Sequence, residues 1–243
     1  KEGDVTGECA CRKAKPMGQR MRRRFLVPLA AMSLFPLSAL GQESGRELPP
    51  AEAERVLEQI AQAQAKVRTI RATIVQRRSS ALLKNDSVTE GRLEAKRPNF
   101  VRWDVDKPSR SIAWIRPDGV TIYYPDRKLA KKPPQWAVAR AAGGLDLVFA
   151  FSERPLDEIH RDFTARVSEG RDGVLVNLLP RRDGLPEMSF VFSRPDYSVK
   201  EIALTPQGAR TITLTFRDLR TNAPIPDARF LPDLPPGTTI GEM

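Results

Sequence analysis

Cysteine is nearly absent from this chain of 243 residues: it has two, Cys9 and Cys11, and both lie close to the first residue. The rest of the chain therefore has to fold without a disulfide. No cysteine remains there for a zinc site or for lipid attachment.

Catalytic motifs are missing as well. The chain has one histidine, His160, and contains no G-x-S-x-G, H-E-x-x-H, phosphate-binding or dinucleotide-binding glycine motif. His160 follows Asp157-Glu158-Ile159 at a predicted helix end, where a cation suits the helix dipole. A surface or capping role is therefore expected, with no catalytic residue, no metal and no cofactor. An exported hydrolase built around His160 is the enzymatic alternative.

A basic stripe of the kind that reads nucleic acid is also lacking, although the formal net charge is +10. The basic doublets are scattered among acidic residues: Arg77-Arg78, Lys131-Lys132 and Arg181-Arg182. Such doublets are typical of a solvated surface, and we expect no nucleic-acid partner.

One apolar run stands near the N-terminus, and its flanks indicate an export signal. Met21 begins a basic segment, Phe25 to Leu37 is apolar but too short to span a bilayer, and Ala39-Leu40-Gly41 supplies small residues. We expect an upstream extension over 1–20, a signal peptide over 21–41 and a single domain over 42–243. The arginine run fits either general or twin-arginine export.

Removing that signal lowers the charge of the remaining domain. Eight Lys and Arg and three Asp and Glu precede Gln42, which reduces the net charge from +10 to +5.

Short alternating segments dominate the rest of the chain. In "FVRWDV", Val101, Trp103 and Val105 alternate with polar residues, as in a strand with one buried face. Turns rich in Gly, Pro and Asp separate such segments, which indicates an antiparallel meander in an α+β fold. Further strands are expected over 70–76, 111–116, 120–124, 163–167, 174–179, 188–193, 200–205 and 211–216.

Helical patterns occur in two places. Pro49-Pro50 precedes apolar residues at three-to-four spacing, and the alanine-rich 136–152 contains Gly143-Gly144, so we expect one long helix and two short ones hinged at these glycines. Both helical parts could cover the concave face of one curved sheet. The proline-rich tail after 223 is expected to be an extended edge segment at best.

Five motifs in order carry a resemblance to a known family. They are "VRTIRATIVQ" (67–76), "EGRLEAKRPNFVRW" (90–103), "DKP" (106–108), "PDGVTIYYPD" (117–126) and a closing section from "TPQG" (205–208) to "PPGTTI" (235–240). Together they resemble the LolA-like periplasmic carriers of outer-membrane lipoproteins, over most of 50–240.

The resemblance implies an open, incomplete antiparallel β-barrel whose concave face is covered by helices. It also implies a periplasmic, monomeric carrier that holds acyl chains of a lipoprotein or related lipid. An inner-membrane transporter would donate this cargo and an outer-membrane receptor would accept it. Arg97 of "KRPN" matches the family's arginine that holds the helical lid closed.

The expected site combines the family's cavity wall with other apolar strand residues. The cavity residues are Val101, Trp103, Trp114, Ile122, Phe190, Phe192, Ile212, Leu214 and Phe216, and the lid residues are Leu145, Leu147, Val148 and Phe149. By pattern alone, these side chains could instead form an ordinary core under a helix.

Two departures from the family pattern leave the cargo open. Val101 stands where the family usually has an aromatic residue, and 136–163 matches poorly. A carrier of another lipid and an envelope sensor with the same fold are therefore the alternatives.

Overall fold

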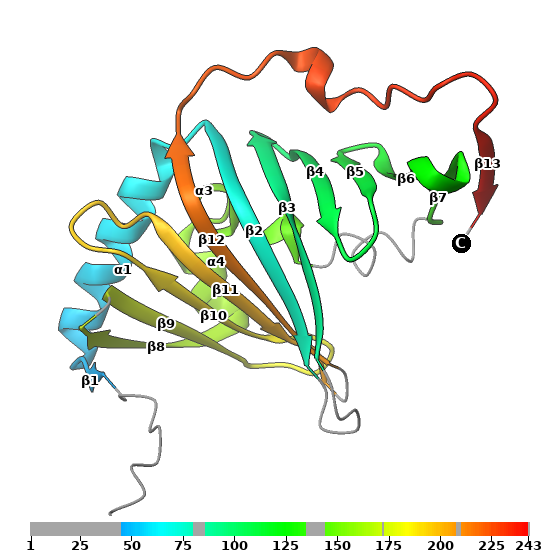
Figure 1. Ribbon diagram of the computed structural model, residues 1–243. Helices are drawn as coiled ribbons and strands as arrows, with labels where there is room; N and C mark the ends of the chain where they lie inside the picture. The colour runs from blue at the N-terminus through cyan, green and yellow to red at the C-terminus, as the bar shows by residue number, and fades with distance from the viewer. Residues whose placement is uncertain (1–44, 80–85, 135–143, 172, 208–209, 243) are drawn as a thin grey trace, which may run out of the picture. The chain divides into compact units, whose positions relative to one another are not determined.

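The structure, a computed structural model, describes residues 45–79, 86–134, 144–171, 173–207 and 210–242 (Figure 1). The predicted extension and signal peptide lie outside these residues. So does Trp136–Gly143, where the first short helix was expected.

The described residues form one thirteen-stranded sheet in the order β1-β8-β9-β10-β11-β12-β2-β3-β4-β5-β6-β7-β13. All neighbours are antiparallel except β7 and β13, which are parallel. The strands are β1 (Arg46–Glu47), β2 (Thr69–Ser79), β3 (Ser87–Lys96), β4 (Phe100–Lys107), β5 (Ser111–Arg116), β6 (Gly119–Tyr124), β7 (Leu129–Lys132), β8 (Phe163–Gly170), β9 (Gly173–Pro180), β10 (Glu187–Phe192), β11 (Val199–Thr205), β12 (Thr211–Thr221) and β13 (Thr239–Glu242).

Helices cover one face of this sheet. In the view of Figure 1, α3 and α4 lie behind the strands. The helical elements are α1 (Pro50–Ala65), η1 (Pro125–Arg127), η3 (Leu145–Leu147), α3 (Ala150–Glu153), α4 (Leu156–Asp162) and η4 (Asp227–Phe230). Helix α1 buries Val56, Leu57 and Ile60 in the same core as the strands. The prediction of a curved antiparallel sheet with a helix-covered face is confirmed.

Strand alternation separates the side chains of β4 and β5 into two faces. Trp103 lies opposite Ala113 and Val101 opposite Ile115, and all four belong to the large core beneath the helices. The intervening pair, Arg102 and Trp114, points to the other face. We call the helix-covered side the concave face and the other side the convex face.

Most predicted strands are confirmed, including the pairing of 163–167 with 174–179 in β8 and β9. Three strands were not predicted: β1, β3, which was expected only to lead into β4, and β7. Strand β3 carries charged side chains along one face, and β1 and β7 have only two and four residues, so the apolar signal of each is weak.

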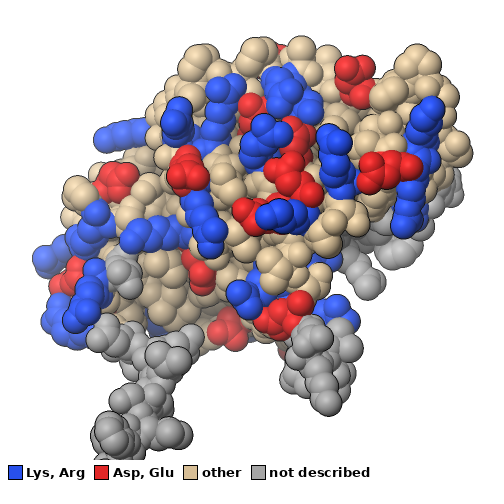
Figure 2. All heavy atoms as spheres, viewed as in Figure 1, with Lys and Arg blue, Asp and Glu red and all other residues tan. Residues whose placement is uncertain are grey.

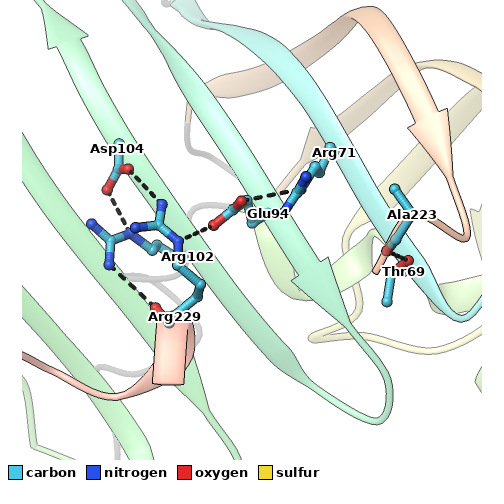
Figure 3. Close-up of polar contacts among 7 residues, drawn as sticks. All are labelled: Thr69, Arg71, Glu94, Arg102, Asp104, Ala223 and Arg229. Carbon is cyan, nitrogen blue, oxygen red and sulfur yellow. Dashed lines mark hydrogen bonds and ion pairs between the residues drawn. The ribbon is translucent and has the colours of Figure 1, made fainter. Parts of the chain in front are cut away.

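In Figure 1 the C-terminal segment runs along the upper ends of the strands and ends beside β7, where Thr239 pairs with Leu129. The expected edge segment is present as β13, whereas the helical turn η4 was not expected. Lys and Arg side chains intermix with Asp and Glu on the face seen in Figure 2. Arg229 of η4 binds Glu94 at 2.8 Å and Asp104 at 3.5 Å, which fixes the segment to β3 and β4 (Figure 3).

Candidate functional site

A short segment closes the concave face over β10, and we call Leu145–Glu153 the lid segment. Three of the predicted lid residues, Leu145, Val148 and Phe149, are buried in the large core, while Leu147 is half-buried at its edge. The expected hinge is described only at Gly144, whose φ of 87° suits glycine.

Phe151 is the central contact of the lid segment with the sheet. Its ring meets Phe190 and Phe192 edge-on, at centroid distances of 4.9 and 5.4 Å. Phe151 was not among the predicted lid residues, although the apolar run "LVFAF" ends at this residue. The run gave no sign of which of its side chains would point at the sheet.

The predicted cavity residues lie mainly in a closed core. Ile122 and Ile212 are half-buried against it. The buried ones are Val101, Trp103, Phe190, Phe192, Leu214 and Phe216. The structure therefore brings eight of the nine predicted residues to one face.

Trp114 is the exception. It belongs to a separate small cluster with Tyr123 and Ala130, against which Leu234 of the C-terminal segment packs. Its ring also lies 5.4 Å from the Arg102 guanidinium. Because Trp114 follows Ala113 by one residue in a strand, it points away from the concave face and does not line a cavity there.

An open pocket of about 370 Å³ remains on the concave side, between the lid segment, α4 and strands β9 and β10. Of the predicted residues, Leu147 and Phe190 line it. The other apolar lining residues are Ala150, Phe151, Ile159, Phe163, Leu178, Leu185, Pro186 and Met188. A volume in this range is usual for sites that bind small molecules.

Three polar residues border this pocket: Asn99, Glu153 and Arg154. With its nitrogen turned toward the lid segment, the Asn99 amide donates to Glu153 Oε2 at 3.1 Å. Burial raises the pKa of the Glu153 carboxyl, and the nearby Arg97 guanidinium partly opposes this rise. The pocket thus has an apolar wall and a polar rim.

Arg97 lies where the end of α1 approaches the lid segment. Its Nη1 donates to the Ala65 carbonyl oxygen at 3.1 Å, at the last residue of α1. Its charge also acts on Glu153, in α3. Arg97 therefore donates one hydrogen bond to α1, and its charge also reaches the lid segment.

Helix α1 is fastened by directional bonds. The buried Gln64 donates to the Tyr197 carbonyl oxygen at 2.6 Å, and the Tyr197 hydroxyl donates to Gln59 at 2.6 Å. His160, at the end of α4 as expected, lies 3.4 Å from Glu54 of α1. The lid segment contributes Leu145, Val148, Phe149 and Phe151 to the apolar core.

Neither a metal cluster nor a membrane-crossing helix is found within the described ranges. No three His, Cys, Asp or Glu side chains there are grouped to hold a metal ion. No helix in those ranges has both the length and the apolar character to cross a bilayer.

Solved structures with a similar fold include an uncharacterized conserved protein of Thermus thermophilus, at 12% identity and a TM-score of 0.48, covering 79% of this chain and 99% of that one. The LolA superfamily protein of Nitrosomonas europaea has 9% identity and a TM-score of 0.40, with coverages of 74% and 97%. MucB in the Pseudomonas aeruginosa MucA/MucB complex has 14% identity and a TM-score of 0.42 over 75% of this chain, which spans 61% of MucB.

Curated protein sequences give no match to the chain. The sequence model of the outer membrane lipoprotein carrier protein LolA matches residues 65–233. That range includes the strands from β2 to β12, the lid segment and every residue lining the pocket. The chain therefore belongs to the LolA family of outer membrane lipoprotein carrier proteins.

Proposed function

We propose that this protein is a periplasmic carrier that binds the acyl chains of lipoproteins or related lipids and ferries them from the inner to the outer membrane. An inner-membrane transporter would supply the cargo and an outer-membrane receptor would accept it. The observation that carries the proposal is the apolar pocket of about 370 Å³ beside the lid segment, in a chain of this family.

The energetics of the lid segment suit reversible binding. Opening it exposes Leu145, Val148, Phe149 and Phe151, each worth about 1.5–3 kcal/mol when buried. An acyl chain that fills the vacated space gains about 0.8 kcal/mol for each buried CH₂ group. About fifteen CH₂ groups would therefore return about 12 kcal/mol, which is comparable with the opening cost.

Such a balance permits release as well as uptake. Apolar contacts are not directional, so acyl chains can replace the lid side chains without matching specific hydrogen bonds. A receptor that offers the acyl chains a comparable apolar surface would then allow the lid segment to return to the sheet.

Arg97 is proposed as the latch of this lid. It is positioned to act on Glu153 of the lid segment while it donates to the end of α1. Removing its charge would leave the Glu153 carboxyl without this compensation, which should weaken the closed state.

The test is to recover the exported chain and identify bound molecules by native mass spectrometry. The parent should carry acylated protein or lipid, while Ala150→Phe, which fills the pocket, should carry little. Ala203→Phe is the matched control, because Ala203 lies on the convex face of β11. Both variants are first compared with the parent by circular dichroism.

Two results would contradict the proposal: a parent without any acyl compound, or an Ala150→Phe variant that retains the same load. Capture of a polypeptide without an acyl chain would point instead to an envelope sensor.

A further inference from the structure

The pocket is closed at its inner end, which limits how much it can hold. Phe151 and Phe190, with Leu147, separate it from a void of about 10 Å³ deeper in the core. That void is too small for an alkyl chain. With the lid segment in place, only the outer space of about 370 Å³ is available, near the lower end of the range for small-molecule sites.

The rim determines which head group would lie at the mouth. It carries one carboxylate, Glu153, and one guanidinium, Arg154. Glu153 already accepts from the Asn99 amide and lies in the field of Arg97. The Glu153 carboxylate therefore already has a hydrogen-bond donor and a neighbouring cation as partners.

Arg154 stands in contrast to Glu153. Both residues are exposed, but within the described part of the chain Arg154 makes no ion pair. Asp162, next to the pocket residue Phe163, is paired with Arg182 at 3.0 Å and Arg161 at 3.6 Å. It therefore brings no uncompensated negative charge to this side of the pocket.

These observations join an apolar space of limited volume to an uncompensated guanidinium at its mouth. A guanidinium binds carboxylate and phosphate oxygens through two parallel hydrogen bonds, an arrangement that neutral head groups cannot match. We propose that the closed pocket takes a single acyl chain with an anionic head group, carboxylate or phosphate, and that Arg154 is its counterion. This inference rests on the proposed function and narrows the cargo of the closed pocket to a related lipid with one acyl chain.

The experiment measures binding of four probes to the delipidated full chain by isothermal titration calorimetry, below their micelle concentrations. The probes are palmitate, palmitoyl lysophosphatidylglycerol, the neutral monopalmitin and inorganic phosphate. Both anionic amphiphiles should bind about tenfold more tightly than monopalmitin, the size of one charge-assisted hydrogen bond at a partly exposed site. Phosphate alone should not bind measurably, because the acyl chain supplies most of the affinity.

Two variants test whether the preference for anionic probes comes from the arginine at the pocket rim or from surface charge in general. Arg154→Gln should lose the preference for anionic probes while its affinity for monopalmitin stays within twofold of the parent. Arg166→Gln, an exposed arginine of β8 that does not line the pocket, should behave like the parent. High salt should reduce the preference in the parent and leave Arg154→Gln unchanged.

The outcomes distinguish the two proposals. If the parent binds palmitate and monopalmitin equally, the head-group inference is overturned while the acyl carrier stands. If palmitate binds with a stoichiometry of two per chain in the same titration, the limit to one chain is wrong. If none of the amphiphiles binds, the proposed function itself fails.

Discussion

Gly91 illustrates how one residue fixes the packing of two strands. It lies at the irregularity in β3 where the register with β4 shifts. A Cβ atom at Gly91 would lie 2.2 Å from the Asp104 carbonyl oxygen and 2.7 Å from Val105 Cα. Both contacts are with backbone, so neither can be relieved by turning a side chain.

Gly91→Ala should therefore destabilise the protein by about 3 kcal/mol or more, because β3 and β4 would have to separate locally. Urea unfolding monitored by circular dichroism measures the change. Gly170→Ala is the control, since the nearest atom to its added Cβ would be 3.9 Å away. Equal stability of the two variants would show that the close approach at Gly91 is readily relieved.

The Glu153 carboxyl makes the stability of the folded protein depend on pH. Burial raises the pKa of its carboxyl, with Arg97 opposing the rise, so the folded state holds this proton more tightly than the unfolded state. Its contribution to stability is therefore most favourable below the carboxyl's ordinary pKa of 4.5 and is lost as pH rises through the folded pKa.

Glu153→Gln should accordingly be more stable than the parent at pH 7 and equal to it near pH 3.5, where the carboxyl is protonated. Thermal unfolding at both pH values gives the comparison, with Glu187→Gln as an exposed carboxylate control on β10. A stability difference that stays the same at the two pH values would argue against burial as its cause.

At the scale of elements, α1 is held at its C-terminal end by a residue far away in sequence. Asn222 accepts from the Arg68 amide at 2.7 Å and donates to the Lys66 carbonyl oxygen at 3.2 Å. Its backbone φ of 59° is in the left-handed region, which Asn tolerates better than most residues. Asn222 thus joins the end of β12 to the start of β2 and the end of α1.

Asn222→Ala should lose about 1–3 kcal/mol, because two hydrogen bonds disappear and alanine is strained at this φ. Asn222→Gly relieves the strain but not the lost bonds, so its stability should fall between Ala and the parent. Guanidinium unfolding of the three proteins measures this order. A glycine variant as stable as the parent would mean that the hydrogen bonds contribute nothing.

At the scale of the whole domain, the C-terminal segment closes one end of the sheet through β13. Phe230 of η4 is buried, and its ring centroid lies 6.0 Å from that of Phe100. Arg229, also in η4, binds Glu94 and Asp104. Lys96 also pairs with Asp227. These contacts hold the segment on the convex face, away from the proposed pocket.

Arg229→Gln should increase hydrogen exchange of the β13 amides by severalfold while global stability falls by about 1 kcal/mol, as expected for partly exposed ion pairs. Hydrogen exchange read by mass spectrometry compares β13 with β10. Arg116→Gln breaks only the local pair with Asp118 and should leave β13 unchanged. Uniform acceleration across both strands would indicate general destabilisation instead of local release.

Sequence by itself determined the antiparallel sheet, the long helix and the family, because alternation and turn residues act between near neighbours in the chain. The sequence could not predict which face of the sheet the Trp114 side chain occupies. The segment "SIAWIR" is apolar on both faces, so the face of each side chain depends on the register with β4.

Tertiary structure decided which sheet face the helices cover, that Phe151 closes the pocket, and that Arg97 donates to α1. It also brought Asn99, Glu153 and Arg154 to one rim. These relations join residues far apart in the chain, and a local pattern carries no information about which distant side chains meet.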